Sequence, residues 1–259
     1  MPIITLTSDW GLTDYTVAAV KGHILTRMPE ATIVDITHNI TPFDINMTAY
    51  IMKHAFQNFP EGTVHIIGVN TTESKYNKHI LFKHKNHYFV GTDNGIPSLI
   101  LDKEIPQMLL ELDVPHDSYL FTFSERDLFT KVAVHIAKGL PVEELGTPLN
   151  SLQEISWIMP QEGPDRLVAT INYADNYGNI VTNITEEFFK KHCKGKKFEI
   201  NLQVGTKITT ISNSYEDVEK NNCVALFNSD GYLEIAMNQG NLFQLFNYEI
   251  SGSIVININ

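Results

Sequence analysis

The chain has 259 residues, enough for one large domain or two modest ones, and 43% of them are apolar, which is ample for a sizeable core. Its 30 acidic and 19 basic side chains give a net charge of -11, which disfavours nucleic acid and anionic lipid as partners. No apolar run approaches the roughly 20 residues of a membrane span, and no signal segment opens the sequence. We therefore expect no nucleic-acid or membrane partner and a cytoplasmic location.

The first part of the chain alternates strand and helix patterns. Near-continuously apolar strands between amphipathic helices predict an α/β domain, residues 1–158, whose central sheet is mostly parallel and covered on both faces. The predicted strands are 3–9, 32–37, 64–69, 79–84, 87–92 and 119–123, and the predicted helices are 14–28, 44–59 and 128–139.

The strand and helix alternation stops after Gly139. Residues 159–167 concentrate proline, glycine and charge, which suits a linker. Short alternating segments with turn residues between them then predict a smaller antiparallel, barrel-like β domain at 168–259, with one helix near 185–192. Two cysteines, Cys193 and Cys223, are too few for a disulfide framework. The ten histidines show no paired spacing typical of a metal site, so we expect none.

Polar residues follow several of the predicted strands. Asp9 ends the first strand, where a carboxylate can accept hydrogen bonds from two vicinal hydroxyls, but Asp9 and Asp14 also suit turn and cap positions. Phe43 precedes Asp44, a natural helix cap, and could pack as a staple or stack on a base. His135, beside the buried face of its helix, is a boundary residue, a ligand or a base.

Two polar, aromatic-bearing segments mark the second half, residues 172–183 and 227–241. Asparagine and aspartate beside glycine are most simply interpreted as turn residues. Asn179 and Asn183 nevertheless offer the paired donor and acceptor that an adenine edge requires.

Six motifs in this order resemble the S-adenosylmethionine hydroxide adenosyltransferases, relatives of fluorinase and chlorinase, and they run over essentially the whole chain. They are SDWGLTD, VDITHNITPFD, YFVGTDNG, FTFSERDLF with VAVHIA, DNYGNIVTNI and NSDGYLEIAMNQGN. The resemblance implies an α/β domain followed by a β-barrel-like domain, and a homotrimer whose active sites lie between one subunit's first domain and a neighbour's second. It also implies displacement at the 5′ carbon of S-adenosylmethionine by water or hydroxide, which yields adenosine and methionine without a cofactor.

The resemblance also implies roles for seven substrate-binding residues. Asp9 would hold the ribose hydroxyls and Phe43 would lie against the ribose and sulfonium. Tyr177 and Asn179 would contact adenine, and Asp175, in the same segment of the chain, would also bind the substrate. Asp14 and Ser229 would contact the amino-acid end of methionine.

One stretch departs from the pattern. Hydrolases of the family carry Asp-Pro-Gly-Val-Gly-Thr and an arginine seven residues after that aspartate, which act on water with a helix histidine. Here the matching stretch is NTTESKYN, so Asn70 and Asn77 replace the charged pair and His135 remains as the catalytic base, with Asn70 as an orienting group. Compensation by Glu73, Lys75 or Lys78 is left open by the sequence.

The sequence supports three alternative hypotheses about function. The leading hypothesis is hydrolysis of S-adenosylmethionine to adenosine and methionine. The alternatives are a protein that binds adenosyl ligands without turnover and a displacement in which another nucleophile, such as halide, replaces water.

Overall fold

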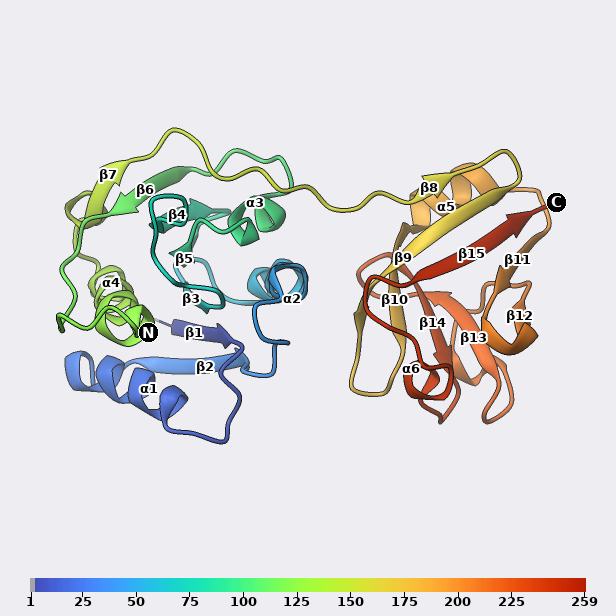
Figure 1. Ribbon diagram of the computed structural model, residues 1–259, viewed down its shortest axis with the longest axis horizontal. Helices are drawn as coiled ribbons and strands as arrows, with labels where there is room; N and C mark the ends of the chain where they lie inside the picture. Colours follow the sequence, from blue (N-terminus) through green and yellow to red (C-terminus); the bar gives the residue numbers. More distant parts are fainter. Residues whose placement is uncertain (1–2) are drawn as a thin grey trace. The chain divides into compact units, whose positions relative to one another are not determined.

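The computed structural model describes residues 3–259, and the chain divides into two compact units between Trp157 and Ile158 (Figure 1). Each unit has its own sheet and its own hydrophobic core. Within residues 3–259, no helix combines the length and the hydrophobicity that a bilayer crossing requires.

The first unit alternates strands and helices in chain order. Its elements are β1 (Ile3–Ser8), α1 (Thr16–Arg27), β2 (Thr32–Thr37), α2 (Ile45–Ala55), η1 (Phe56–Asn58), β3 (Val64–Gly68), β4 (His79–His84), β5 (His87–Thr92), α3 (Ile96–Leu101), β6 (Met108–Leu112), η2 (Glu125–Phe129), α4 (Thr130–Ala137), η3 (Val142–Leu145) and β7 (Gly146–Pro148).

Seven strands form one mixed sheet in the order β2-β1-β3-β5-β4-β6-β7. The four neighbours β2, β1, β3 and β5 are parallel, whereas β4 is antiparallel to both β5 and β6, and β7 to β6. The carboxyl ends of β1, β3 and β5 therefore share one edge, and β6 ends at that edge too.

Helices cover both faces of this sheet, as the sequence predicts. On one face, α1 and α4 bury residues such as Val20 and Val132 against Ile4 of β1. On the other, α2 and α3 pack against residues such as Phe89 of β5. The start of α2 is fixed by Asp44, whose Oδ1 accepts a hydrogen bond of 2.9 Å from the backbone N–H of Met47.

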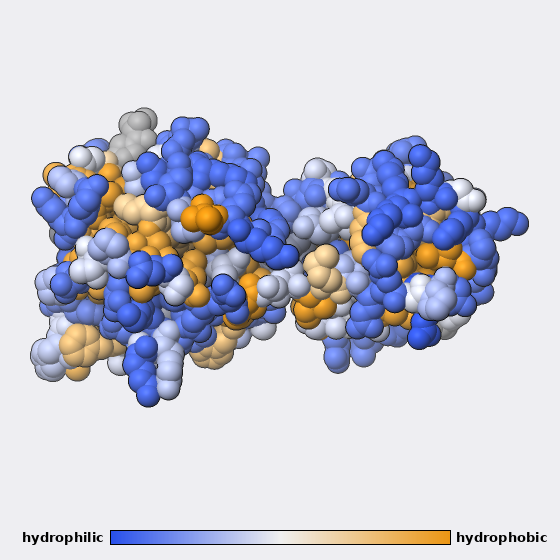
Figure 2. Space-filling model, turned by 90° about the horizontal axis from the view of Figure 1, so that it is seen from above, coloured by the Kyte–Doolittle hydropathy of each residue, from blue (hydrophilic) through white to orange (hydrophobic). Residues whose placement is uncertain are grey.

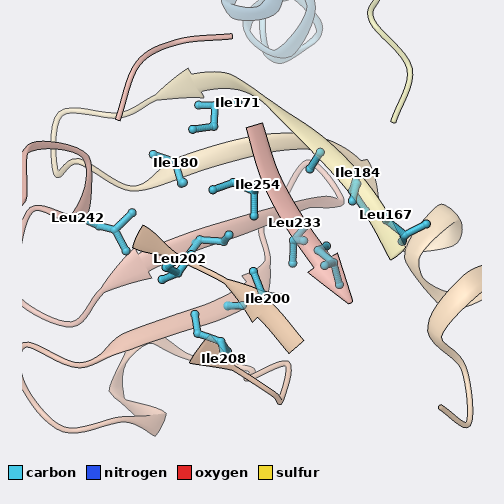
Figure 3. Packing of buried hydrophobic residues seen from close by; sticks show 14 of the residues in the cluster. Leu167, Ile171, Ile180, Ile184, Ile200, Leu202, Ile208, Leu233, Leu242 and Ile254 are labelled. Carbon is cyan, nitrogen blue, oxygen red and sulfur yellow. The ribbon is translucent and has the colours of Figure 1, made fainter. Parts of the chain in front are cut away.

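The second unit is an antiparallel sheet of eight strands with a barrel-like arrangement, and its path runs β12-β11-β15-β9-β10-β14-β13 while β8 pairs with β9. Its core consists mainly of isoleucine and leucine side chains that point between the strands (Figure 3). Its elements are β8 (Gln161–Glu162), β9 (Arg166–Ala174), β10 (Ile180–Thr185), α5 (Glu186–Cys193), β11 (Phe198–Asn201), η4 (Gln203–Gly205), β12 (Lys207–Ile208), η5 (Tyr215–Asp217), β13 (Cys223–Phe227), β14 (Tyr232–Met237), α6 (Leu242–Leu245) and β15 (Ser253–Ile258).

Three local differences from the sequence predictions stand out. Residues 159–167, predicted as a linker, contain β8 and the first residues of β9. The prediction of a strand at 119–123 is wrong. These residues form turns and a loop, and Tyr119 is 84% exposed. The one-turn helix α6 has no periodic signal, and Asn241 caps it through a hydrogen bond from the N–H of Gln244.

Candidate functional site

The parallel strands bring their carboxyl ends together at one edge of the first sheet. Ser8 at the end of β1 pairs with Gly68 at the end of β3. Trp10, two residues after Ser8, lies over Gly68, where a Cβ atom would come within 2.3 Å of the indole ring. The glycine therefore allows the loop after β1 to pack onto the end of β3, and polar residues from separate loops become neighbours at this edge.

Asp9 and Phe43 are brought together here. The Oδ2 atom of Asp9 accepts a hydrogen bond of 2.8 Å from the backbone N–H of Phe43. Phe43 adopts a positive φ of 66° and leaves its ring 72% exposed. A bulky residue in this left-handed conformation is unusual and indicates a backbone that its surroundings hold in place.

Asp14 occupies a different position. It is fully exposed, and its Oδ1 accepts a hydrogen bond of 2.8 Å from the N–H of Thr16 at the start of α1. That bond holds the pKa of the Asp14 carboxyl below its usual value. Asp14 thus serves the turn into α1.

The loop 70–78, which follows β3, carries both asparagines of the predicted water-handling pair. Asn70 has a positive φ of 50°, and Asn94, two residues after β5, donates hydrogen bonds of 3.0 Å to the carbonyl groups of Val69 and Asn70. Asn77 accepts a hydrogen bond of 3.1 Å from Nε2 of Gln153. Both asparagines lie at the strand-end edge, and the Asn77 side chain fastens the loop to a later segment.

Each of the compensating residues that the sequence left open contacts another side chain. The Nζ of Lys78 lies 2.5 Å from a carboxylate oxygen of Glu111, and the Nζ of Lys75 lies 4.6 Å from the ring centroid of Tyr76. Glu73 lies beside His79, with 3.8 Å between its Oε2 and the histidine Nδ1.

A buried carboxyl that the sequence reasoning missed lies at this edge. Glu125, at the start of η2, is 6% exposed, and the hydroxyl of Thr71 donates a hydrogen bond of 2.5 Å to its Oε1. Burial and, to a smaller extent, the negative charge of Asp9 raise the pKa of the Glu125 carboxyl, while the Thr71 bond acts in the opposite direction. A carboxylate with a raised pKa is a suitable proton acceptor near neutral pH.

His135, predicted as the base, is not part of this group. It lies in the last turn of α4, and its Nε2 is 2.7 Å from the carbonyl oxygen of Pro141, beyond the end of the helix. Glu125 is ten residues earlier, so His135 lies about 15 Å farther along the helical axis. The end of this helical segment that faces the loop 70–78 therefore presents Glu125 and not His135.

The second unit contains a cavity of about 660 Å³, of the size that small-molecule sites commonly have. Three of the predicted substrate-binding residues line it, together with five residues that the sequence did not single out individually. The lining residues are Asp175, Tyr177, Asn179, Tyr215, Met237, Gln239, Gly240 and Asn241.

Asp175 organises one wall of this cavity. Its Oδ1 accepts hydrogen bonds of 2.9 Å from the backbone N–H groups of Tyr177 and Asn179, and its Oδ2 accepts one of 3.0 Å from Nδ2 of Asn179. Because a carboxylate only accepts, this contact fixes the amide orientation and leaves the Asn179 Oδ1 as an acceptor. Tyr177 is 75% exposed and offers a free ring face.

The two other candidates in this unit differ. Asn183 holds the backbone, since its Oδ1 accepts from the N–H of Thr170 and its Nδ2 donates to the carbonyl of Ile158. Ser229 is exposed in the turn between β13 and β14 and lies outside the cavity lining.

Tyr215 is the lining residue that the sequence gave least reason to expect, because it lies in a polar stretch without periodicity. Its hydroxyl donates a hydrogen bond of 2.7 Å to Glu234, which is buried. Burial raises the pKa of both groups, and the bond fixes the tyrosine ring as a wall of the cavity.

Comparison with known proteins agrees with this two-unit architecture. Residues 4–146 match the S-adenosylmethionine hydroxide adenosyltransferase N-terminal domain, and residues 169–255 match the C-terminal domain of the same family. The chain is a member of the S-adenosylmethionine hydroxide adenosyltransferase family.

Relatives match over nearly the full chain. An (R)-S-adenosyl-L-methionine hydrolase of Methanocaldococcus jannaschii is 30% identical over 99% of this chain and 96% of its own length. A fluorinase of Nocardia brasiliensis is 25% identical over 99% and 97%. A crystal structure of an uncharacterized conserved protein from Thermotoga maritima superposes with a TM-score of 0.87 at 28% identity, covering 98% of this chain and 99% of that one.

Proposed function

We propose that the protein hydrolyses S-adenosylmethionine to adenosine and methionine by attack of water on the 5′ carbon of the ribose. The observation that carries this proposal is the buried Glu125 carboxyl beside Asp9, in a chain that aligns along its whole length with hydrolases of this substrate. Two carboxyl groups at one strand edge also attract a sulfonium cation.

Asp9 and Phe43 form the proposed ribose contact. The bond to the Phe43 N–H uses part of the acceptor capacity of the Asp9 carboxylate, which retains lone pairs for two vicinal hydroxyls. The same bond fixes the exposed Phe43 ring next to that position, where it would pack on the ribose and sulfonium.

The cavity of the second unit is the proposed adenine site. Adenine would stack on Tyr177, and its exocyclic amino group would donate to the Asn179 Oδ1, the atom that Asp175 leaves available. Asp14 and Ser229, which are both exposed, remain the proposed contacts for the amino-acid end of methionine.

The chemistry requires one proton acceptor. As the water oxygen forms a bond to the 5′ carbon, the bond from that carbon to sulfur breaks and its electron pair leaves with methionine as a neutral thioether. The water proton passes to the Glu125 carboxylate and then to solvent. The sulfonium already provides the leaving group, so the protein supplies alignment, a dry site and the base.

Glu125 replaces His135 as the base in this proposal. Asn70 keeps its proposed role of orienting the water, since its amide both donates and accepts. Asn77 becomes a positioning residue, because its side chain holds the loop 70–78 to Gln153.

We further propose a cytoplasmic homotrimer in which the strand edge of one subunit and the adenine cavity of a neighbour bind the same substrate molecule. Hydrophobic residues reach the surface of both units (Figure 2). In the first unit, seven large ones lie in the loops that follow β1, β2, β3 and β6, where a neighbouring subunit would bury them. They are Leu12, Tyr15, Phe43, Tyr76, Tyr119, Leu120 and Phe121. Light scattering would then give three times the chain mass of 29.3 kDa, and a monomer would contradict this assembly.

The test of function is chromatography of the nucleosides formed from S-adenosylmethionine, supplied as both sulfonium epimers because the relative's name specifies the (R) form. Adenosine above the enzyme-free rate supports hydrolysis. Binding without adenosine indicates an adenosyl-binding protein, and a halogenated nucleoside in the presence of chloride indicates a different nucleophile. Either result would contradict the proposal.

A further inference from the structure

Three side chains beside the loop 70–78 converge on one point. Glu73 comes from that loop, His79 begins β4, and His116 lies in the loop between β6 and η2. One ligand atom of each lies within 4.8 Å of the other two. Two imidazoles and a carboxylate form a donor set that Zn²⁺ and similar ions bind.

The hydrogen bonding of His79 prepares it as a ligand. Its Nε2 lies 2.9 Å from the carbonyl oxygen of Thr71, and because a carbonyl only accepts, Nε2 carries the proton. Nδ1 therefore holds the lone pair and faces Glu73 at 3.8 Å. A metal-ligating histidine commonly donates its other N–H to a backbone carbonyl in this way.

The buried nitrogens at this point lack other partners. Among the described residues, none forms a hydrogen bond with His79 Nδ1 or with either ring nitrogen of His116, and all three atoms are buried. The two rings lie 6.1 Å apart between centroids. Buried polar atoms in folded proteins almost always have a partner, and leaving one unsatisfied is costly. A bound cation would satisfy two of these atoms at once.

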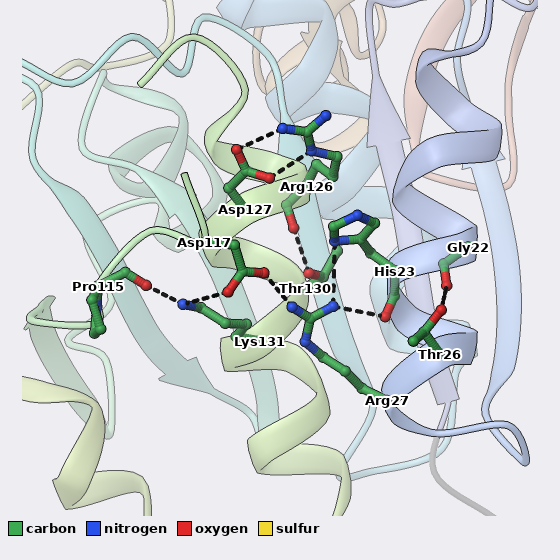
Figure 4. Close-up of polar contacts among 10 residues, drawn as sticks. All are labelled: Gly22, His23, Thr26, Arg27, Pro115, Asp117, Arg126, Asp127, Thr130 and Lys131. Carbon is green, nitrogen blue, oxygen red and sulfur yellow. Dashed lines mark hydrogen bonds and ion pairs between the residues drawn. The ribbon is translucent and has the colours of Figure 1, made fainter. Parts of the chain in front are cut away.

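A second group with similar spacing shows the contrast. It consists of His23, Asp117 and Asp127. Here both carboxylates already form ion pairs with cationic side chains (Figure 4). Arg126 binds Asp127 at 2.5 and 2.8 Å, and Asp117 pairs with both Arg27 and Lys131. These ion pairs leave no net negative charge for a metal.

We propose that Glu73, His79 and His116 bind one divalent transition-metal ion, with Zn²⁺ as the best match. Bonds of about 2.0–2.1 Å in a tetrahedron place ligand atoms about 3.4 Å apart, so closing the site needs only small side-chain movements. Glu73 is half exposed, which leaves room for water as the fourth ligand.

The ion would fix the loop beside the reaction site. It joins the loop 70–78 to β4 and to the loop that carries His116. Thr71 connects this site with the proposed base, because its carbonyl accepts from His79 while its hydroxyl donates to Glu125. Metal binding thus orders the residue that holds Glu125.

The test is equilibrium dialysis of the full, tag-free chain, stripped with a chelator, against Zn²⁺ alone, with metal counted by emission spectroscopy and no substrate present. We expect one tightly bound ion per chain and a rise in the midpoint of thermal unfolding. His116→Ala and Glu73→Ala should each weaken binding at least about tenfold and abolish that rise. His23→Ala, in the ion-paired cluster, is the matched control and should bind as the native chain does.

Two results would overturn the proposal: a native chain that binds no Zn²⁺, or Glu73→Ala and His116→Ala chains that keep native affinity. Glu73→Ala changes a half-exposed side chain, so it tests the site even if His116→Ala does not fold. Because the assay contains no S-adenosylmethionine, its outcome is independent of the proposed hydrolysis.

Discussion

Replacement of Glu125 by glutamine tests the proposed base directly. The amide keeps the shape of the carboxyl and still accepts the hydrogen bond from Thr71, but it cannot take a proton. Loss of a general base lowers the rate by about 10²- to 10⁴-fold, which corresponds to roughly 3–5 kcal/mol in the activation barrier. Because the amide removes a buried charge, the variant should fold at least as stably as the native chain.

The assay is the pH dependence of kcat/KM for adenosine formation. Burial raises the pKa of Glu125, so the native rate should fall with decreasing pH through a pKa above the ordinary glutamate value, since only the deprotonated form accepts the proton. This acid limb should vanish in Glu125→Gln. His135→Ala, a control on the same helical segment, should keep native rate and profile. A Glu125→Gln rate within about threefold of native, or a large loss in His135→Ala, would refute the assignment.

Three further outcomes are expected. Asp9→Asn should raise KM for S-adenosylmethionine about tenfold, because the amide accepts fewer ribose hydroxyl bonds; an unchanged KM would remove Asp9 from the ribose contact. Tyr177→Ala should weaken adenosine binding by roughly 1–3 kcal/mol through lost stacking, as measured by calorimetry, and equal affinity would place adenine elsewhere. Burial lowers the pKa of His65 to about 3, so its contribution to stability is complete above pH 6.5 and declines as the pH falls from there toward 3. Urea unfolding at pH 5 should therefore show a loss of about 2 kcal/mol relative to pH 7, and equal stabilities would contradict this.

The strand and helix pattern was readable because burial imposes it directly. Strands such as β3 are buried throughout and mostly apolar, since helices cover both faces of the sheet, and their spacing predicts the parallel arrangement. Residues 119–123 are also rich in aromatic and aliphatic side chains, but 119–122 remain exposed, because composition alone does not show whether a neighbouring strand is available for pairing.

The site could be predicted only in part from the sequence, because its geometry depends on which segments meet in the fold. Polar residues at strand ends, such as Asp9, follow from topology, but the base depends on which end of a helical segment faces the site. His135 has the more familiar chemistry, whereas Glu125 becomes a candidate only when its burial and its bond to Thr71 are known. The pairing of His79 with His116 likewise joins residues far apart in sequence, without motif spacing.

The most direct test of the central claim is the fate of the solvent oxygen. The protein is incubated with S-adenosylmethionine in water enriched in oxygen-18, and the products are weighed by mass spectrometry. Water attack at the 5′ carbon predicts adenosine that carries one heavy oxygen at its 5′ hydroxyl, together with unlabelled methionine. Unlabelled adenosine, or no adenosine above the enzyme-free rate, would contradict hydrolysis by this protein.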